Sequence, residues 1–133
     1  MGTSFDPLGH IKIAVSDYAG ESRGFYQALF GELGYEQVDD GEDGAGWQTP
    51  EGLGIWVSQA EVAEPKYVHG APGLHHFCLK ASSPKRVDKI HQFLVAQGVH
   101  IFNTPQAYPQ YTPDYYAVFF ADPDGIKLEV AYY

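Results

Sequence analysis

The sequence has very little cysteine, and nothing in it looks like a membrane segment. Cys78 is the single cysteine among 133 residues, so an internal disulfide is excluded and a reducing compartment is favoured. No apolar run approaches the roughly 20 residues of a transmembrane helix, and the first residues carry no signal-peptide pattern. We therefore expect a cytoplasmic protein without a membrane partner.

Positive charge is also scarce. Eight Lys and Arg residues stand against 17 Asp and Glu residues, which gives a formal net charge of −9 at pH 7. Such an acidic chain argues against nucleic acid or an anionic membrane as the main partner, because both would repel it. The remaining composition is that of one globular domain, residues 1–133, with enough apolar residues for a core. A small-molecule partner fits this composition.

One pattern of elements occurs twice along the chain. The segment His-Ile-Lys-Ile-Ala-Val-Ser at residues 10–16 aligns without a gap with His-Phe-Cys-Leu-Lys-Ala-Ser at residues 76–82. Each segment alternates like a strand, and each is followed by a helical pattern that ends in glycine and then by three further strand patterns. The sequence thus predicts an α+β fold with two βαβββ modules, at about 10–59 and 76–132. We expect them to form a cupped mixed sheet, with a linker at about 60–73.

The last hairpin carries the clearest local signal. Residues 122–125 read Asp-Pro-Asp-Gly, which is a turn sequence because proline presets φ and Gly125 permits a positive φ. After the turn, Ile126, Leu128 and Val130 form one face of a strand, and Glu129 lies on the other. The segment Asn103–Pro113 is rich in proline and tyrosine and is expected to be a loop.

Three potential metal ligands share one predicted face. Apolar alternation directs the neighbours of His10, His76 and Glu129 toward the helices, so these three side chains point to the opposite, concave side. Two imidazoles and a carboxylate suit a mononuclear divalent metal site with open positions. Fe, Mn, Zn and Ni fit these ligands about equally. On the same face, Lys12 either holds an anionic substrate group or is simply solvated, and Cys78 is interpreted as a small filler.

At these residues the chain resembles the vicinal oxygen chelate superfamily, which includes glyoxalase I, bleomycin-resistance proteins, fosfomycin-resistance enzymes and extradiol dioxygenases. The resemblance rests on the opening His-x-x-x-x-Val, on the second His-Phe-Cys-Leu-Lys, and on the closing Asp-Pro-Asp-Gly-x-x-x-Glu. It implies a metal held by His10, His76 and Glu129. It also implies a homodimer, because relatives with two modules per chain commonly dimerise.

Departures from the family patterns narrow the choice among the activities of the superfamily. Glyoxalase I resembles this layout but takes a fourth metal ligand from the last strand of the first module. In that strand Trp56 and Ser58 are expected to face the concave side, whereas Gln59 would need a one-residue bulge to do so. Extradiol dioxygenases have a tyrosine ten residues before the glutamate, and that position is Phe119 here. The arginine beyond the glutamate that fosfomycin enzymes need does not occur before Tyr133.

The sequence therefore predicts a metal-dependent small-molecule enzyme, either a glyoxalase-like lyase or isomerase or a dioxygenase, that chelates substrate oxygens. Trp56 and Phe119 would form apolar walls, and Tyr111, Tyr116 and a metal-bound hydroxide are the candidates for the general base. Residues 108–116 are either a lid or a rigid proline loop. The alternative is a metal-free protein that sequesters a bulky ligand, as bleomycin-resistance proteins do.

Overall fold

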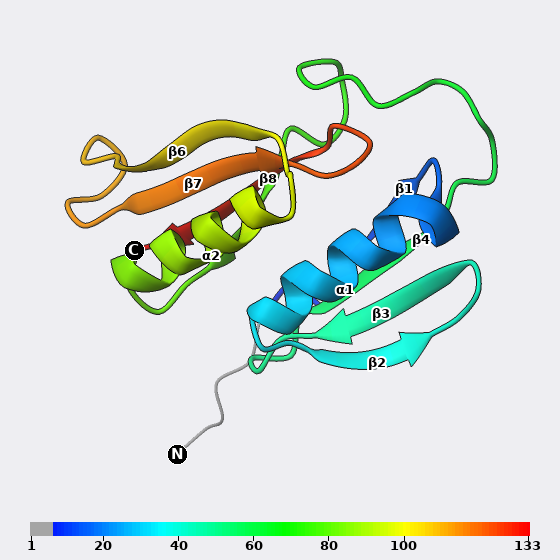
Figure 1. The fold of residues 1–133 in the computed structure, drawn as a ribbon, viewed down its shortest axis with the longest axis horizontal. Helices are drawn as coiled ribbons and strands as arrows, with labels where there is room; N and C mark the ends of the chain where they lie inside the picture. Colours follow the sequence, from blue (N-terminus) through cyan, green and yellow to red (C-terminus); the bar gives the residue numbers. More distant parts are fainter. Residues whose placement is uncertain (1–6) are drawn as a thin grey trace. The chain divides into compact units, whose positions relative to one another are not determined.

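The computed structural model describes residues 7–133, which divide into two compact units, one up to Lys66 and one from Tyr67. Each unit contains a four-stranded sheet and a covering helix in the order βαβββ, as the repeat predicted (Figure 1). In each sheet the first and last strands of the unit pair in parallel, and the other pairs are antiparallel. The α+β fold with two βαβββ repeats is confirmed.

In the first unit the sheet has the strand order β1-β4-β3-β2. Its buried core contains Ile55 and Val57 of the sheet and Leu29 and Phe30 of the helix, and the Phe30 ring packs against Trp47 of the sheet at 4.9 Å between centroids. The elements are β1 (His10–Val15), the π-helical turn η1 (Tyr18–Ser22), α1 (Arg23–Glu32), β2 (Glu36–Asp40), β3 (Gly44–Gln48) and β4 (Gly54–Gln59).

The second unit repeats this arrangement with the order β5-β8-β7-β6. Val118 and Phe120 of one strand and Leu128 and Val130 of the next are fully buried on the side of the helix. The elements are β5 (Phe77–Lys80), α2 (Pro84–Ala96), β6 (Ile101–Ala107), β7 (Tyr116–Ala121) and β8 (Lys127–Tyr132).

A polar side chain caps the start of each helical segment. The side chain of Asp17 accepts a hydrogen bond from the Gly20 amide and caps the helical segment at η1. Ser83 accepts a hydrogen bond from the Arg86 amide, and Pro84 follows it in the first turn of α2. Both caps satisfy amides that have no acceptor within the helix.

The turn at 122–125 joins β7 to β8 as predicted. Asp122 is 5% exposed, and its Oδ1 accepts hydrogen bonds from the amides of Asp124 (2.9 Å) and Ile126 (2.8 Å). Gly125 has φ +84°, which only glycine adopts without strain in such a turn. The turn thereby sets the register in which Phe119 is the cross-strand partner of Glu129.

Some boundaries differ from the sequence prediction. The predicted loop at 103–113 begins as strand, because β6 runs through Pro105 to Ala107. β5 begins only at Phe77, so the two histidines before it lie outside the ladder. Val95 is 56% exposed and does not belong to the buried stripe of α2.

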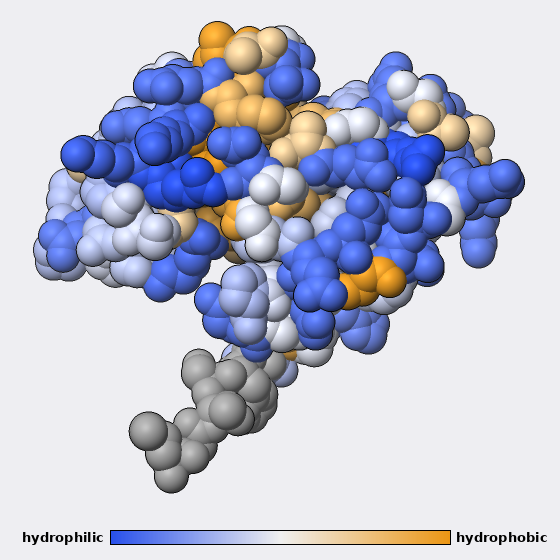
Figure 2. All heavy atoms as spheres, turned by 60° about the horizontal axis from the view of Figure 1, so that its bottom comes forward, coloured by the Kyte–Doolittle hydropathy of each residue, from blue (hydrophilic) through white to orange (hydrophobic). Residues whose placement is uncertain are grey.

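The surface is dominated by polar residues on the face that Figure 2 draws, with apolar side chains gathered in a few places. None of the helices among residues 7–133 is long and apolar enough to cross a membrane.

Candidate functional site

Glu129 lies on β8, one of the two central strands of the second sheet, and its side chain is on the face away from α2. Its cross-strand partners are Cys78 of β5 and Phe119 of β7, so all three side chains share that face. Glu129 is only 2% exposed, and Ala117, Phe119 and Ala131 form a buried apolar cluster beside it. A carboxylate in such a layer needs polar partners, since burial of an unpaired charge is strongly unfavourable.

His76 supplies one of these partners. Its Nε2 lies 3.1 Å from Glu129 Oε1, so two of the three predicted ligands meet in the second unit. The His76 ring also contacts the Phe119 ring, with 5.8 Å between centroids. Strand alternation predicted that Phe119 and Glu129 share a face. His76 precedes β5, so its contact with Glu129 is set by the path of the chain there.

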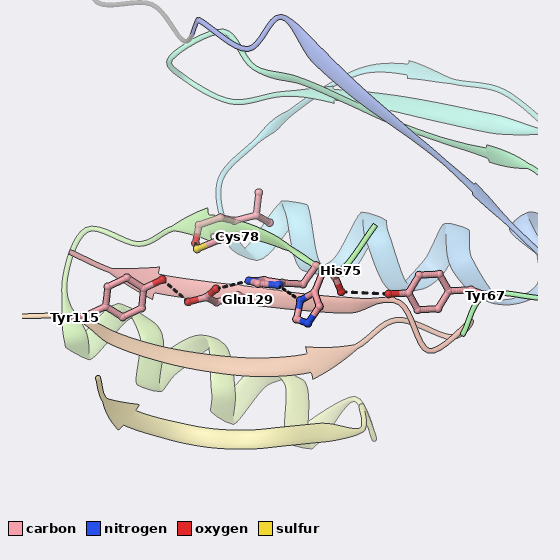
Figure 3. A network of polar contacts seen from close by, with 7 residues as sticks. Tyr67, His75, Cys78, Tyr115 and Glu129 are labelled. Carbon is pink, nitrogen blue, oxygen red and sulfur yellow. Dashed lines mark hydrogen bonds and ion pairs between the residues drawn. The ribbon is translucent and has the colours of Figure 1, made fainter. Parts of the chain in front are cut away.

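Tyr115 supplies the other partner. Its hydroxyl donates a hydrogen bond of 2.6 Å to Glu129 Oε2, so the two carboxylate oxygens face different groups (Figure 3). Partial burial, followed by this hydrogen bond, raises the pKa of Tyr115 well above its ordinary value, which keeps the phenol protonated as a donor. The sequence analysis did not single out Tyr115, because it lies just before β7, where alternation gives its side chain no direction.

His75 extends the chain of contacts beyond His76. The Nδ1 atoms of the two histidines are 2.7 Å apart (Figure 3). The His75 ring also packs against His69, at 4.6 Å between centroids. Extending the alternation of β5 backward would direct His75 toward the helix, but that pattern does not apply because β5 starts at Phe77.

A layer of tyrosines continues from Tyr115. Its ring stacks on Tyr133 at 4.6 Å, and Tyr108 and Tyr111 stack on each other at 5.5 Å while both contact Tyr115 edge-on. The loop that carries them is tied by hydrogen bonds from the Tyr108 amide to the Tyr115 carbonyl and from the Tyr111 amide to the Tyr108 carbonyl. Tyr111, a predicted site residue, therefore contacts Tyr115, the hydrogen-bond partner of Glu129.

The thiol and the lysines of this face complete its electrostatics. Burial, and then the Glu129 carboxylate, raise the pKa of the Cys78 thiol to about 12, so the thiol is protonated at neutral pH. Lys80 Nζ lies 4.1 Å from the centre of the Tyr133 ring, and Lys127 Nζ lies 4.7 Å from that of Phe119. Cys78 acts here as a buried neutral group rather than as a nucleophile.

Tyr116 lies on the other face of the second sheet. Its hydroxyl donates a hydrogen bond of 2.7 Å to Asp88 Oδ1 of α2. The structure thus does not bring Tyr116 to Glu129. The signal was present in the sequence, because Tyr116 has the same parity as the buried Val118 and Phe120.

The first unit presents its own group of predicted site residues. His10 and Lys12 alternate with the helix-facing residues of β1, and Lys12 pairs with Trp56 of β4. A Cβ placed on Gly54 would lie 3.1 Å from the His10 Cβ and 3.4 Å from Trp56 Nε1, so His10 and Trp56 flank this glycine. His10, Lys12 and Trp56 therefore share one face of the first sheet.

Gln59 has a structural role in this unit. Its Oε1 accepts a hydrogen bond from the Tyr18 amide (2.9 Å), and its Nε2 donates one to the Ser16 carbonyl (2.8 Å). The β1–β4 ladder runs through Gln59 without a register shift. Its amide is thus committed to the β1–η1 connection, which disfavours the four-ligand arrangement of glyoxalase I.

The second unit offers two donors of the kinds that divalent metals accept, the His76 imidazole and the Glu129 carboxylate. Donor atoms about 2.0–2.2 Å from one ion lie roughly 2.8–3.6 Å apart when they are adjacent, and His76 Nε2 and Glu129 Oε1, which are in hydrogen-bond contact, are separated by 3.1 Å. A group of three or more His, Cys, Asp or Glu side chains arranged for a metal does not occur within residues 7–133. His10, the third predicted ligand, belongs to the other unit.

Comparisons with known proteins cover nearly the whole chain. The family model described as "Glyoxalase/Bleomycin resistance protein/Dioxygenase superfamily" matches residues 7–130. The chain is 32% identical over 124 residues to the uncharacterized protein YqjT of Bacillus subtilis (strain 168), covering 92% of this chain and 96% of that protein.

Solved structures agree in fold. A Bacillus halodurans protein, provisionally named a glyoxalase, superposes with a TM-score of 0.81 at 30% identity, covering 96% of each chain. A glyoxalase/bleomycin resistance protein from Albidiferax ferrireducens T118 superposes with a TM-score of 0.76 at 22% identity, covering 96% of this chain and 100% of that one.

Proposed function

Because the chain belongs to the glyoxalase/bleomycin resistance protein/dioxygenase superfamily, we propose that it is a metal-dependent enzyme acting on a small oxygen-bearing substrate. One observation carries this proposal: His76 Nε2 and Glu129 Oε1 lie 3.1 Å apart beside a buried cluster of aromatic and small side chains. His10, at the equivalent position of the first repeat, is the third ligand in this proposal.

Each of the site residues has a separate role in this proposal. His10, His76 and Glu129 would hold one divalent ion, which as a Lewis acid polarises substrate oxygens. In this proposal Phe119 and Trp56 would provide apolar walls that exclude water, and Lys12 would offer a positive charge to an anionic substrate group. Tyr111 is the remaining tyrosine candidate for proton transfer, because the hydroxyl of Tyr116 is bound to Asp88. Because the Gln59 amide is bound within the β1–η1 connection, dioxygenase-like or three-ligand lyase chemistry is favoured over the four-ligand arrangement of glyoxalase I.

Metal content tests the proposal directly. Protein purified without a histidine tag is loaded with Fe, Mn, Ni or Zn, dialysed and subjected to elemental analysis. We expect about one ion per chain in the parent, and loss of the ion in Glu129→Gln, His76→Ala and His10→Ala. His100→Ala is the matched control, since His100 is exposed and contacts the Phe102 ring rather than Glu129. A parent that retains none of the four metals would refute the metal-dependent enzyme.

The second candidate is a metal-free protein that sequesters a cationic ligand. Tyr111 and Tyr133 are 60% and 48% exposed, and the face of Tyr133 already contacts a cation, the Lys80 ammonium. Aromatic faces bind cations through their negative quadrupole, and the net charge of −9 adds a favourable field. Thermal shift of the metal-free protein with cationic aromatic compounds tests this candidate, and Tyr111→Ala should abolish the shift.

We also propose that the protein is a cytoplasmic homodimer. The support for dimerisation is family membership together with two βαβββ repeats per chain. The single cysteine supports a reducing compartment. Light scattering after size exclusion should give twice the chain mass of 14.7 kDa at micromolar concentration. A monomer mass would contradict the dimer.

A further inference from the structure

The His76–Glu129 pair is held at both ends by hydrogen bonds that run in one line through the second unit. In Figure 3 the line starts at Tyr115, passes through Glu129 and ends at His75. We propose that Tyr115 and His75 are positioning residues, which turn Glu129 Oε1 and His76 Nε2 toward a common ion. This inference rests on the proposed function for its ion, whereas the hydrogen-bond line itself is tested without any metal.

Tyr115 acts on the carboxylate. Of the two equivalent oxygens of Glu129, Oε2 accepts the Tyr115 hydroxyl at 2.6 Å, so Oε1 is the one that remains beside His76. The phenol is itself fixed, because its ring stacks on Tyr133 and its amide donates to the Thr112 carbonyl at 3.2 Å. Without the hydroxyl, the carboxylate can rotate and exchange its oxygens.

His75 acts on the imidazole. A neutral imidazole has one donor and one acceptor nitrogen, so the protonation of Nδ1 and Nε2 is linked. When His76 Nε2–H donates to Glu129, His76 Nδ1 accepts from His75. When Nε2 is bare, as a metal ligand must be, Nδ1–H donates to the His75 Nδ1 at 2.7 Å. His75 can complete either hydrogen bond, because its own ring nitrogen can donate or accept.

The backbone and a neighbouring ring hold His75 in place. The Tyr67 hydroxyl donates to the Leu74 carbonyl at 2.9 Å and to the His75 carbonyl at 3.2 Å, and Figure 3 shows Tyr67 beside His75. The ring of His69 packs edge-on against His75 at 4.6 Å. These contacts fix the segment before β5, where no ladder hydrogen bond does so.

Zinc affinity provides the first measurement. Zn²⁺ is titrated against a chromophoric chelator in the parent and in Tyr115→Phe, His75→Leu and two control variants. We expect Tyr115→Phe and His75→Leu to bind about 10- to 100-fold more weakly, as is usual when an outer partner of a ligand is removed. Tyr116→Phe removes a comparable phenol–carboxylate hydrogen bond on the other face and should not change the affinity. His75→Asn keeps a polar group near the Nδ1 position and should restore most of it.

The tautomer of His76 provides the second measurement. Long-range ¹H–¹⁵N correlation spectra of the metal-free protein should show His76 as one tautomer, protonated at Nε2, in the parent and in Tyr116→Phe. Tyr115→Phe and His75→Leu should give a mixture of tautomers. Circular dichroism of each variant shows that it is folded.

The two measurements separate the two hypotheses. A parent that binds no Zn²⁺ but shows the single His76 tautomer contradicts the metal-dependent function and retains the hydrogen-bond line. If Tyr115→Phe matches Tyr116→Phe in both measurements, Tyr115 is not a positioning residue. If His75→Leu matches the parent in both, the same conclusion holds for His75.

Discussion

The turn that sets the register of β8 can be tested by removing one carboxylate. Asp122 is 5% exposed, and its Oδ1 accepts the amides of Asp124 and Ile126 at 2.9 and 2.8 Å. Asp122→Ala leaves both amides without this acceptor. The backbone bonds from the Asp122 amide to the Ile126 carbonyl and from the Gly125 amide to the Asp122 carbonyl remain, so the turn should persist in a less stable protein.

The magnitude follows from the two lost hydrogen bonds. A hydrogen bond to a charged group contributes about 1.5–3 kcal/mol, and an amide left buried without a partner adds a desolvation cost. The bond to Ile126 is buried, whereas water can replace part of the bond to Asp124. We therefore expect Asp122→Ala to lower the free energy of unfolding by about 2–4 kcal/mol. Asp122→Asn keeps one carbonyl acceptor and should lose less than half of that.

Urea unfolding is the assay, and its probe matters. Both tryptophans, Trp47 and Trp56, lie in the first unit, so their fluorescence does not report directly on the turn. Far-UV circular dichroism follows both units, and its midpoint should fall by about 1–2 M urea for a typical slope. Asp114→Ala, in an exposed part of the tyrosine loop, is the control and should stay within about 0.5 kcal/mol of the parent. An Asp122→Ala midpoint equal to that of the control would refute the reasoning.

Two glycine substitutions should act in opposite directions. A Cβ on Gly46 would lie 2.5 Å from the Trp56 ring, so Gly46→Ala should displace that indole, destabilise the protein by about 1–3 kcal/mol and shift tryptophan emission; an unchanged spectrum would contradict this contact. Gly31 lies in α1 with no atom within 4 Å of an added Cβ, so Gly31→Ala should raise the free energy of unfolding by about 0.5–1 kcal/mol, and a destabilised variant would show that the site is not open.

Strand alternation was sufficient to predict the fold and the shared face of Phe119 and Glu129. Burial of Leu128 and Val130 against α2 leaves Glu129 on the other face, and the pairing of β7 with β8 then places Phe119 beside it. The same reasoning would have placed Tyr116 on the helix side, where its hydroxyl meets Asp88. Parity is reliable here because a ladder with regular register fixes the direction of each side chain.

Residues just outside the strands could not be predicted in this way. His75 precedes β5 and Tyr115 precedes β7, so neither side chain has a direction set by a ladder. Their roles depend on the path of the chain before each strand. The continuation of β6 beyond residue 102 was not predicted for another reason: Pro105 lies in it, and proline is tolerated there because β6 is the edge strand of its sheet.

Folding stability alone does not explain why a carboxylate occupies position 129. It is 2% exposed and lies beside Ala117, Phe119 and Ala131, where an apolar side chain would extend the buried cluster without desolvating a charge. The hydrogen bonds from Tyr115 and His76 offset part of this desolvation, but replacing buried ionic groups by apolar ones is often neutral or stabilising. A carboxylate at this position therefore makes physical sense chiefly as a ligand or a proton acceptor. For that reason the metal-free Glu129→Met/Tyr115→Phe double variant, which also removes the hydroxyl that would lose its acceptor, should be at least as stable as the parent in urea, although it cannot hold an ion.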